Sequence, residues 1–236
     1  MVVDKYRIIS LLLQRFFAMC CLMFSPLALA GEVLPSWGEG TSRSAIIAFV
    51  ERVTDTRSPD YVEPAQRIAT FDNDGTLWSE QPLYFQAIFA FDRVKALAAD
   101  NPQWKEQEPF ASVLSGDVNG ALAGGVPAQK EIIMATHAGM TTDEFVEVSG
   151  NWLESARHPK TGMRYNAMVY QPMLELLDYL RANGFTTFIV SGGGTAFKRA
   201  YTEQCYGIPP WQVVGSSGET EFRYWDSSPT LVKLPE

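Results

Sequence analysis

The apolar run Ile68–Phe71 passes directly into a polar turn that contains two carboxylates, Asp72 and Asp74, and a glycine, Gly75. In an open α/β sheet, a side chain at the carboxyl end of a strand points into the crevice where ligands bind, and the residue two positions later points to the same side. Glycine at this place lets the backbone turn sharply away. Two acids this close imply either a bound cation or split pKa values.

A second apolar run, about 120 residues further along the chain, is also followed by a polar segment that contains glycine. Phe185–Val190 reads as a buried strand, and the polar, glycine-rich segment Ser191–Gly194 follows it at once. The two segments therefore predict neighbouring strand ends that share one crevice.

The rest of the pattern alternates helices with strands. Ser42–Thr54 has apolar residues at helical spacing, and a further helix is predicted between Pro172 and Gly184. A third strand is expected at Gln212–Gly215. The long stretch from Pro82 to Tyr165 is helical and loop-like, with no strand pattern. This order predicts the α/β class with a parallel sheet and right-handed connections.

The two strand-end segments together resemble the motifs of the haloacid dehalogenase-like hydrolase superfamily. Asp72-Asn-Asp74-Gly-Thr after a hydrophobic strand is similar to the first motif, and Val190–Gly193 resembles the second motif of the phosphoserine phosphatase-like branch. The resemblance implies a phosphomonoester hydrolase that acts on a small phosphorylated metabolite.

The same resemblance implies a domain plan. A Rossmann-like core would comprise residues 31–82 and 167–236, and a helical cap over the crevice would comprise residues 83–166. The cap would determine which alcohol the substrate carries.

The roles of the matched residues also follow from the resemblance. Asp72 would attack phosphorus to give an aspartyl-phosphate, and Asp74 would act as general acid and base. Mg²⁺ would be held by Asp72 and by the backbone carbonyl of Asp74. The Ser191 hydroxyl and the Gly192 amide would hold phosphate oxygens at the N-terminus of a helix.

Beyond Ser191 the sequence departs from the family pattern. No Asp-Asp, Asp-x-x-x-Asp or Gly-Asp sequence follows it, although members of the superfamily carry a distal acidic pair and a lysine. Lys233, 42 residues beyond Ser191, lies at a plausible distance to be that lysine, but it falls in a predicted hairpin, Glu221–Trp225 with Leu231–Leu234, and we prefer to interpret it as a surface lysine. The expectation is a chain truncated at its C-terminus, with an incomplete sheet and weakened metal binding.

Two alternatives to the phosphatase remain open at this stage. A haloacid dehalogenase would also use Asp72 but has no need of an acid at Asp74, which argues against it. A non-catalytic or inactive remnant of such an enzyme is the other alternative, because of the missing acids.

His137 and His158 have no metal-ligand spacing and are interpreted as ordinary cap residues. Glu80 is interpreted as a solvated side chain in preference to a substrate contact.

Residues 1–30 read as a secretory signal peptide, with basic residues, then an apolar stretch, then Ala28-Leu-Ala30 before the expected cleavage site. A retained anchor is the less favoured interpretation. We expect a periplasmic or secreted protein with no stable membrane association after signal removal.

The formal net charge of the chain is −8, and because residues 1–30 hold three basic residues and one acidic residue, it becomes −10 without them. This acidity disfavours nucleic acid as a partner.

Overall fold

The computed structural model describes residues 32–225 and 227–234. The chain divides into two compact units, Met1–Val33 and Leu34–Glu236, and the second contains all of the helices and strands that the structure describes. The predicted signal peptide, residues 1–30, lies outside the described residues. Within them, no helix is long and apolar enough to span a membrane.

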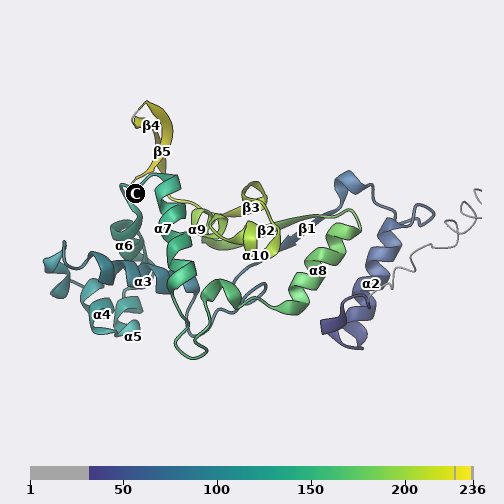
Figure 1. Cartoon of the computed structure of the whole chain (residues 1–236), viewed down its shortest axis with the longest axis horizontal. Helices are drawn as coiled ribbons and strands as arrows, with labels where there is room; N and C mark the ends of the chain where they lie inside the picture. The colour runs from purple at the N-terminus through teal and green to yellow at the C-terminus, as the bar shows by residue number, and fades with distance from the viewer. Residues whose placement is uncertain (1–31, 226, 235–236) are drawn as a thin grey trace, which may run out of the picture. The chain divides into compact units, whose positions relative to one another are not determined.

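Three parallel strands form the central sheet, in the order β1 (Ile68–Phe71), β2 (Thr186–Gly194) and β3 (Val213–Ser216) (Figure 1). Phe71 pairs with Ile189, so the turn that contains Asp72 leaves β1 beside the part of β2 that leads into Ser191. The α/β class and the parallel sheet predicted from the sequence are confirmed. Outside residues 83–166 the α-helices are α2 (Thr41–Thr54), α8 (Gln171–Ala182), α9 (Thr195–Arg199) and α10 (Thr202–Tyr206).

The two faces of the sheet differ in burial. On one face, Ile189 and Val213 are buried and Phe71 packs beside them against the main hydrophobic core. On the other face Ile68, Val190 and Val214 are exposed. The main core also contains aromatic and aliphatic side chains from helices and turns far apart in the chain: Leu77, Trp78, Phe85, Phe89, Phe145, Leu153, Tyr165, Leu177, Phe197, Tyr201, Tyr206 and Ile208.

Residues 83–166, which the sequence assigned to a cap, contain helices and no named strand. The helices are α3 (Phe85–Leu97), α4 (Phe110–Ser115), α5 (Val118–Ala123), α6 (Gly125–His137) and α7 (Thr142–Ser155). Thr141 begins α7 with a capping box, because its side chain accepts from the Glu144 N–H while Glu144 accepts from the Thr141 N–H. A second core cluster, which includes Val94 and Ile132, holds α3 against α6. The assignment of this segment as a separate domain stays a prediction.

Short 3₁₀ helices complete the described fold: Pro35–Trp37, Pro64–Gln66, Pro102–Lys105, Tyr165–Ala167 and Pro210–Gln212.

The predicted hairpin forms from antiparallel strands β4 (Thr220–Trp225) and β5 (Ser228–Lys233), which pair with one another and not with the parallel sheet (Figure 1). Lys233 N–H donates to the Met140 carbonyl and Gly139 N–H donates to the Lys233 carbonyl. The hairpin is therefore anchored on the turn between α6 and α7.

Candidate active site

Asp72 lies at the carboxyl end of β1, where its side chain is exposed and its Oδ1 accepts a hydrogen bond of 2.7 Å from the Asn73 N–H. The register that pairs Phe71 with Ile189 places Asp72 beside the end of the regular β1–β2 ladder, next to the segment that begins at Ser191. The predicted adjacency of the two parallel strands is confirmed, but only Asp72 lies at a strand end, because Ser191 lies within β2, which continues to Gly194.

The turn after Asp72 is closed by backbone hydrogen bonds. The Asn73 carbonyl accepts from the N–H groups of Thr76 and Leu77. Gly75 has a φ of +74°, and a Cβ there would lie 2.9 Å from the Glu80 carboxyl carbon. Gly75 is thus required both by its left-handed backbone and by the half-buried Glu80 carboxylate, which lies against the turn.

Asp74 is held on both of its carboxylate oxygens. Trp78 Nε1 donates to Oδ1 at 2.8 Å, and Lys198 Nζ lies 3.8 Å from Oδ2. Trp78 in turn stacks on Tyr201 with ring centroids 4.4 Å apart, and the Tyr201 hydroxyl accepts from Asn73 Nδ2 at 3.0 Å. These contacts fix the orientation of the Asp74 side chain.

Lys198 is the charged residue that sequence reasoning missed. Its side chain is 2% exposed, and its nearest carboxylate is that of Asp74. Burial lowers the pKa of Lys198 below 10.5, while the nearby Asp74 and Asp72 carboxylates act in the opposite direction. The structure therefore brings one buried ammonium group to the two aspartates of the first motif.

Lys233 occupies a different environment. Its Nζ lies 4.7 Å from the centroid of the Phe145 ring, and burial lowers its pKa. The interpretation of Lys233 as a surface lysine was wrong, because the hairpin folds back on α7 and half-buries the side chain. The lysine that accompanies the aspartates in this structure is Lys198.

The expectation that Ser191 and Gly192 lie at a helix N-terminus was also wrong. Strand β2 continues to Gly194, and α9 begins only at Thr195. The cause is a close approach of β3: the Ser216 hydroxyl donates to the Gly192 carbonyl at 2.8 Å, and a Cβ on Gly215 would lie 2.5 Å from the Gly193 carbonyl oxygen. The phosphate-binding role of Ser191 and Gly192 stays a prediction.

At two successive glycines of this segment, a long side chain from another element occupies the space that a Cβ would take. A Cβ on Gly193 would lie 2.1 Å from Lys198 Nζ, and a Cβ on Gly194 would lie 2.6 Å from Gln86 Nε2. Gln86 comes from the first turn of α3, and its Oε1 accepts from the Gly194 N–H at 2.8 Å. The glycines thus allow α9 and α3 each to bring a polar side chain to the strand end.

The oxygen ligands for a metal are few. In residues 32–225 and 227–234, no group of three or more His, Cys, Asp or Glu side chains could hold a metal ion. The two hard oxygens that the resemblance assigns to a metal are the exposed Asp72 carboxylate and the Asp74 backbone carbonyl, and their role as ligands stays a prediction. This set fits Mg²⁺, which commonly binds one or two carboxylates and fills its other positions with water and substrate phosphate.

Both histidines are buried and contact other protein groups. His158 is buried, its Nε2 lies 2.9 Å from the Gln81 carbonyl, and its Nδ1 accepts from the N–H groups of Lys160 and Thr161. The buried ring of His137 lies 4.5 Å from that of Phe145. Burial, with the charges of Lys233 and Arg93, lowers the pKa of His137 to about 3.

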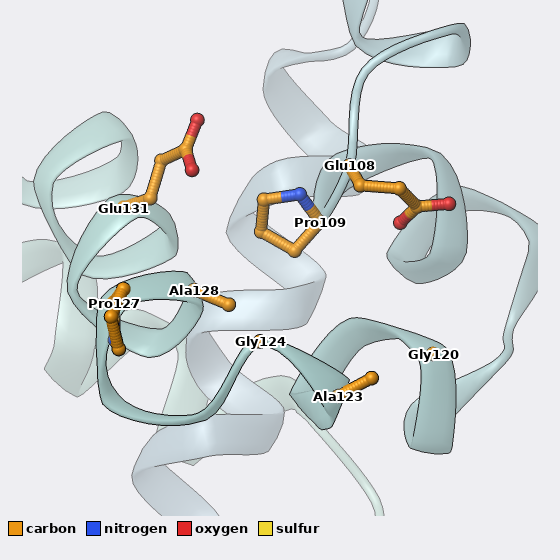
Figure 2. A pocket seen from close by; sticks show the side chains of 8 residues that line it. All are labelled: Glu108, Pro109, Gly120, Ala123, Gly124, Pro127, Ala128 and Glu131. Atoms are coloured by element: carbon orange, nitrogen blue, oxygen red, sulfur yellow. The ribbon is translucent and has the colours of Figure 1, made fainter.

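A hollow of about 350 Å³ lies elsewhere, among α4, α5 and α6. Figure 2 shows the carboxylates of Glu108 and Glu131 at its rim, on opposite sides of Pro109. The remaining lining residues are small or apolar, and none of the predicted site residues contributes to it.

The parallel α/β sheet, with an Asp-x-Asp turn and a serine-glycine segment at adjacent strand ends, defines a hydrolase of the haloacid dehalogenase-like type. A family model described as haloacid dehalogenase-like hydrolase matches residues 69–229, which is more than half of the chain. The chain belongs to this family.

Solved structures that resemble the chain include a phosphoserine phosphohydrolase-like protein from Francisella tularensis subsp. tularensis SCHU S4. The TM-score is 0.36 and the identity 17%, with 68% of this chain and 61% of that chain covered. A conserved protein of unknown function from Anaerococcus prevotii DSM 20548 has a TM-score of 0.41 and 14% identity, with 82% and 71% covered. The chain thus spans about 61% of the length of the first of these proteins. No match was found among curated proteins.

Proposed function

We propose that this chain is a phosphomonoester hydrolase that acts through an aspartyl-phosphate on Asp72. Membership of the hydrolase family supports a hydrolytic reaction. The observation that carries the more specific proposal is the contact of the buried Lys198 ammonium with Asp74, close to Asp72. A cation beside two carboxylates suits a reaction in which a phosphoryl group brings further negative charge to the same place.

The first half of the reaction uses Asp72 as nucleophile. An oxygen of the Asp72 carboxylate bonds to phosphorus while the bond between phosphorus and the ester oxygen breaks. Asp74 in its protonated form gives its proton to the leaving alkoxide, so the alcohol departs neutral. The contacts of Trp78 and Lys198 with Asp74 keep that carboxyl group in one orientation.

The second half returns the enzyme to its starting form. Asp74, now ionised, takes a proton from water as the water oxygen bonds to phosphorus, and the bond from phosphorus to Asp72 breaks. Orthophosphate leaves and Asp72 is again a free carboxylate. Lys198 remains charged throughout and offsets negative charge that moves between Asp72 and the phosphoryl group.

Mg²⁺ would be held by the Asp72 carboxylate and the Asp74 backbone carbonyl. When bound, it would neutralise part of the charge on the phosphoryl oxygens. The Ser191 hydroxyl and the Gly192 N–H would donate to those oxygens.

The proposal extends to the substrate and the compartment. We propose a small phosphorylated metabolite as substrate, since the acidic surface does not favour a polyanionic nucleic acid. We also propose that the protein is exported, which rests on the sequence of residues 1–30 alone.

The experiment is hydrolysis of an aryl phosphate by the purified full chain, with Mg²⁺ and with a chelator. Turnover that requires the metal and is lost in Asp72→Asn is expected, because an amide cannot form the acyl-phosphate. Release of halide from a short 2-haloacid without release of phosphate from the ester would favour the dehalogenase alternative. Absence of both activities would favour the non-catalytic alternative.

A further inference from the structure

Gln86 joins the helical segment to the glycine-rich strand end by one specific contact. It lies in the first turn of α3, is half-buried, and accepts from the Gly194 N–H at 2.8 Å. The two residues are 108 positions apart in the chain. This hydrogen bond connects the first long helix after the Asp72 turn with the segment that follows Ser191.

The hydrogen bond determines which end of the amide is available. Since the Gly194 N–H is a donor, the Gln86 oxygen must face it, and the NH₂ group must point elsewhere. In the described part of the chain, Gln86 Nε2 donates no hydrogen bond to a protein group, and this nitrogen is not among the buried atoms that lack a partner. Gln86 therefore keeps an NH₂ group that is neither bonded to protein nor fully buried.

The position of this amide relates it to the candidate active site. A Cβ on Gly193 would lie 3.3 Å from Gln86 Oε1 and 2.1 Å from Lys198 Nζ, so the Gln86 amide and the Lys198 ammonium both lie against Gly193. Lys198 in turn contacts Asp74. A neutral amide in this position adds hydrogen-bonding capacity without adding a second charge that would have to be desolvated.

We propose that Gln86 is a substrate-binding residue whose NH₂ group donates to an oxygen of the phosphate ester, while its oxygen stays bound to Gly194. This inference rests on the proposed phosphatase function. The Gly194 contact fixes the amide before substrate arrives, so little conformational freedom is lost on binding. Gln86 also ties the position of α3 to Gly194 at the end of β2.

Gln86→Glu separates this role from a purely structural one. The carboxylate has the same length and still accepts from the Gly194 N–H, but it has no donor and carries a charge that repels phosphate. We expect the full chain with this change to keep its melting temperature. We expect kcat/KM for an aryl phosphate to fall by about tenfold or more, mainly through KM, as for the loss of a hydrogen bond to a charged group. Binding of orthophosphate, measured by calorimetry, should weaken by a similar factor.

Two further variants control the result. Tyr84→Glu places the same charge at an exposed position at the start of α3 and should leave kcat/KM and orthophosphate binding close to those of the wild type. Gln86→Met keeps the volume but loses both ends of the amide, so it should weaken orthophosphate binding and also lower the melting temperature.

The outcomes are distinct. If Gln86→Glu binds orthophosphate as the wild type does, Gln86 only anchors the loop and the proposal is wrong. An equal effect of Tyr84→Glu would show a general charge effect and would also overturn it. A wild-type chain that binds orthophosphate through Gln86 but hydrolyses no ester would contradict the proposed function alone. A wild-type chain that does neither would overturn both.

Discussion

Lys198 Nζ occupies the space that a Cβ on Gly193 would fill, with only 2.1 Å between the nitrogen and the ideal Cβ position. The ammonium group can lie 3.8 Å from Asp74 because position 193 has no side chain. The glycine of the second motif thus makes room for a cation that comes from the following helix, α9.

Gly193→Ala should therefore displace Lys198 from Asp74. The displaced group is the end of a flexible side chain, so we expect only a modest loss of stability. Turnover of an aryl phosphate should fall by about tenfold or more, as expected when a charged interaction at a reacting group is lost. Gly218→Ala, where an added Cβ has no neighbour within 4 Å, is the matched control and should retain wild-type turnover. Wild-type turnover in Gly193→Ala would show that Lys198 has no part in the reaction.

Lys198→Met should change how stability depends on pH. Because the pKa of Lys198 in the folded chain is below its usual 10.5, the unfolded chain binds more protons as the pH approaches that value. The stability of the wild type should therefore rise relative to the variant between the lowered pKa and 10.5. Urea unfolding of both proteins across the alkaline range measures the difference. Parallel stability curves would mean that Lys198 is not desolvated.

His137 should affect the pH dependence of stability in the acidic range. Its pKa is lowered from 6.5 to about 3, so the unfolded chain takes up a proton that the folded chain resists as the pH falls. Its contribution to the free energy of unfolding is full above 6.5 and is lost progressively towards 3, by roughly 1.4 kcal/mol for each pKa unit. His137→Gln should lose stability less steeply over this range, which acid-induced unfolding followed by circular dichroism measures. An unchanged slope would contradict the burial of a neutral imidazole.

Asp74→Asn should depend on the leaving group of the ester. Formation of the intermediate needs no proton when the leaving group is a good one, such as an activated phenol, but it does when the leaving group is an alkyl alcohol. We expect single-turnover formation of the intermediate to slow far more for the alkyl phosphate than for the activated aryl phosphate. Equal slowing with both esters would remove the general-acid role from Asp74 and leave the role of Asp72 intact.

Local patterns predicted most of the regular structure. The strand before Asp72 and the helix that begins near Pro172 both form as expected, because each depends on residues close in sequence. The end of β2 was not predicted, because Ser191–Gly194 stays extended through pairing with β3, more than 20 residues away. A loop of glycines has no pattern of its own that reveals such a partner.

The polar residues that complete the candidate site were missed for a related reason. A lysine on a short helix is usually exposed, and nothing near Lys198 in the sequence indicates a buried carboxylate partner. Gln86 lies in a helix among apolar residues, and its partner Gly194 is distant in the chain. The one local signal was the run of three glycines, since glycine is required where other groups approach the backbone closely.

Rapid-quench mass spectrometry of the full chain during turnover of an aryl phosphate can detect the intermediate itself. We expect a phosphoryl group on the peptide that contains Asp72, present in the first turnover and lost as orthophosphate appears. The label should be absent from Asp72→Asn. Turnover without any phosphorylated peptide, or with the phosphoryl group on another residue, would show that Asp72 is not the nucleophile.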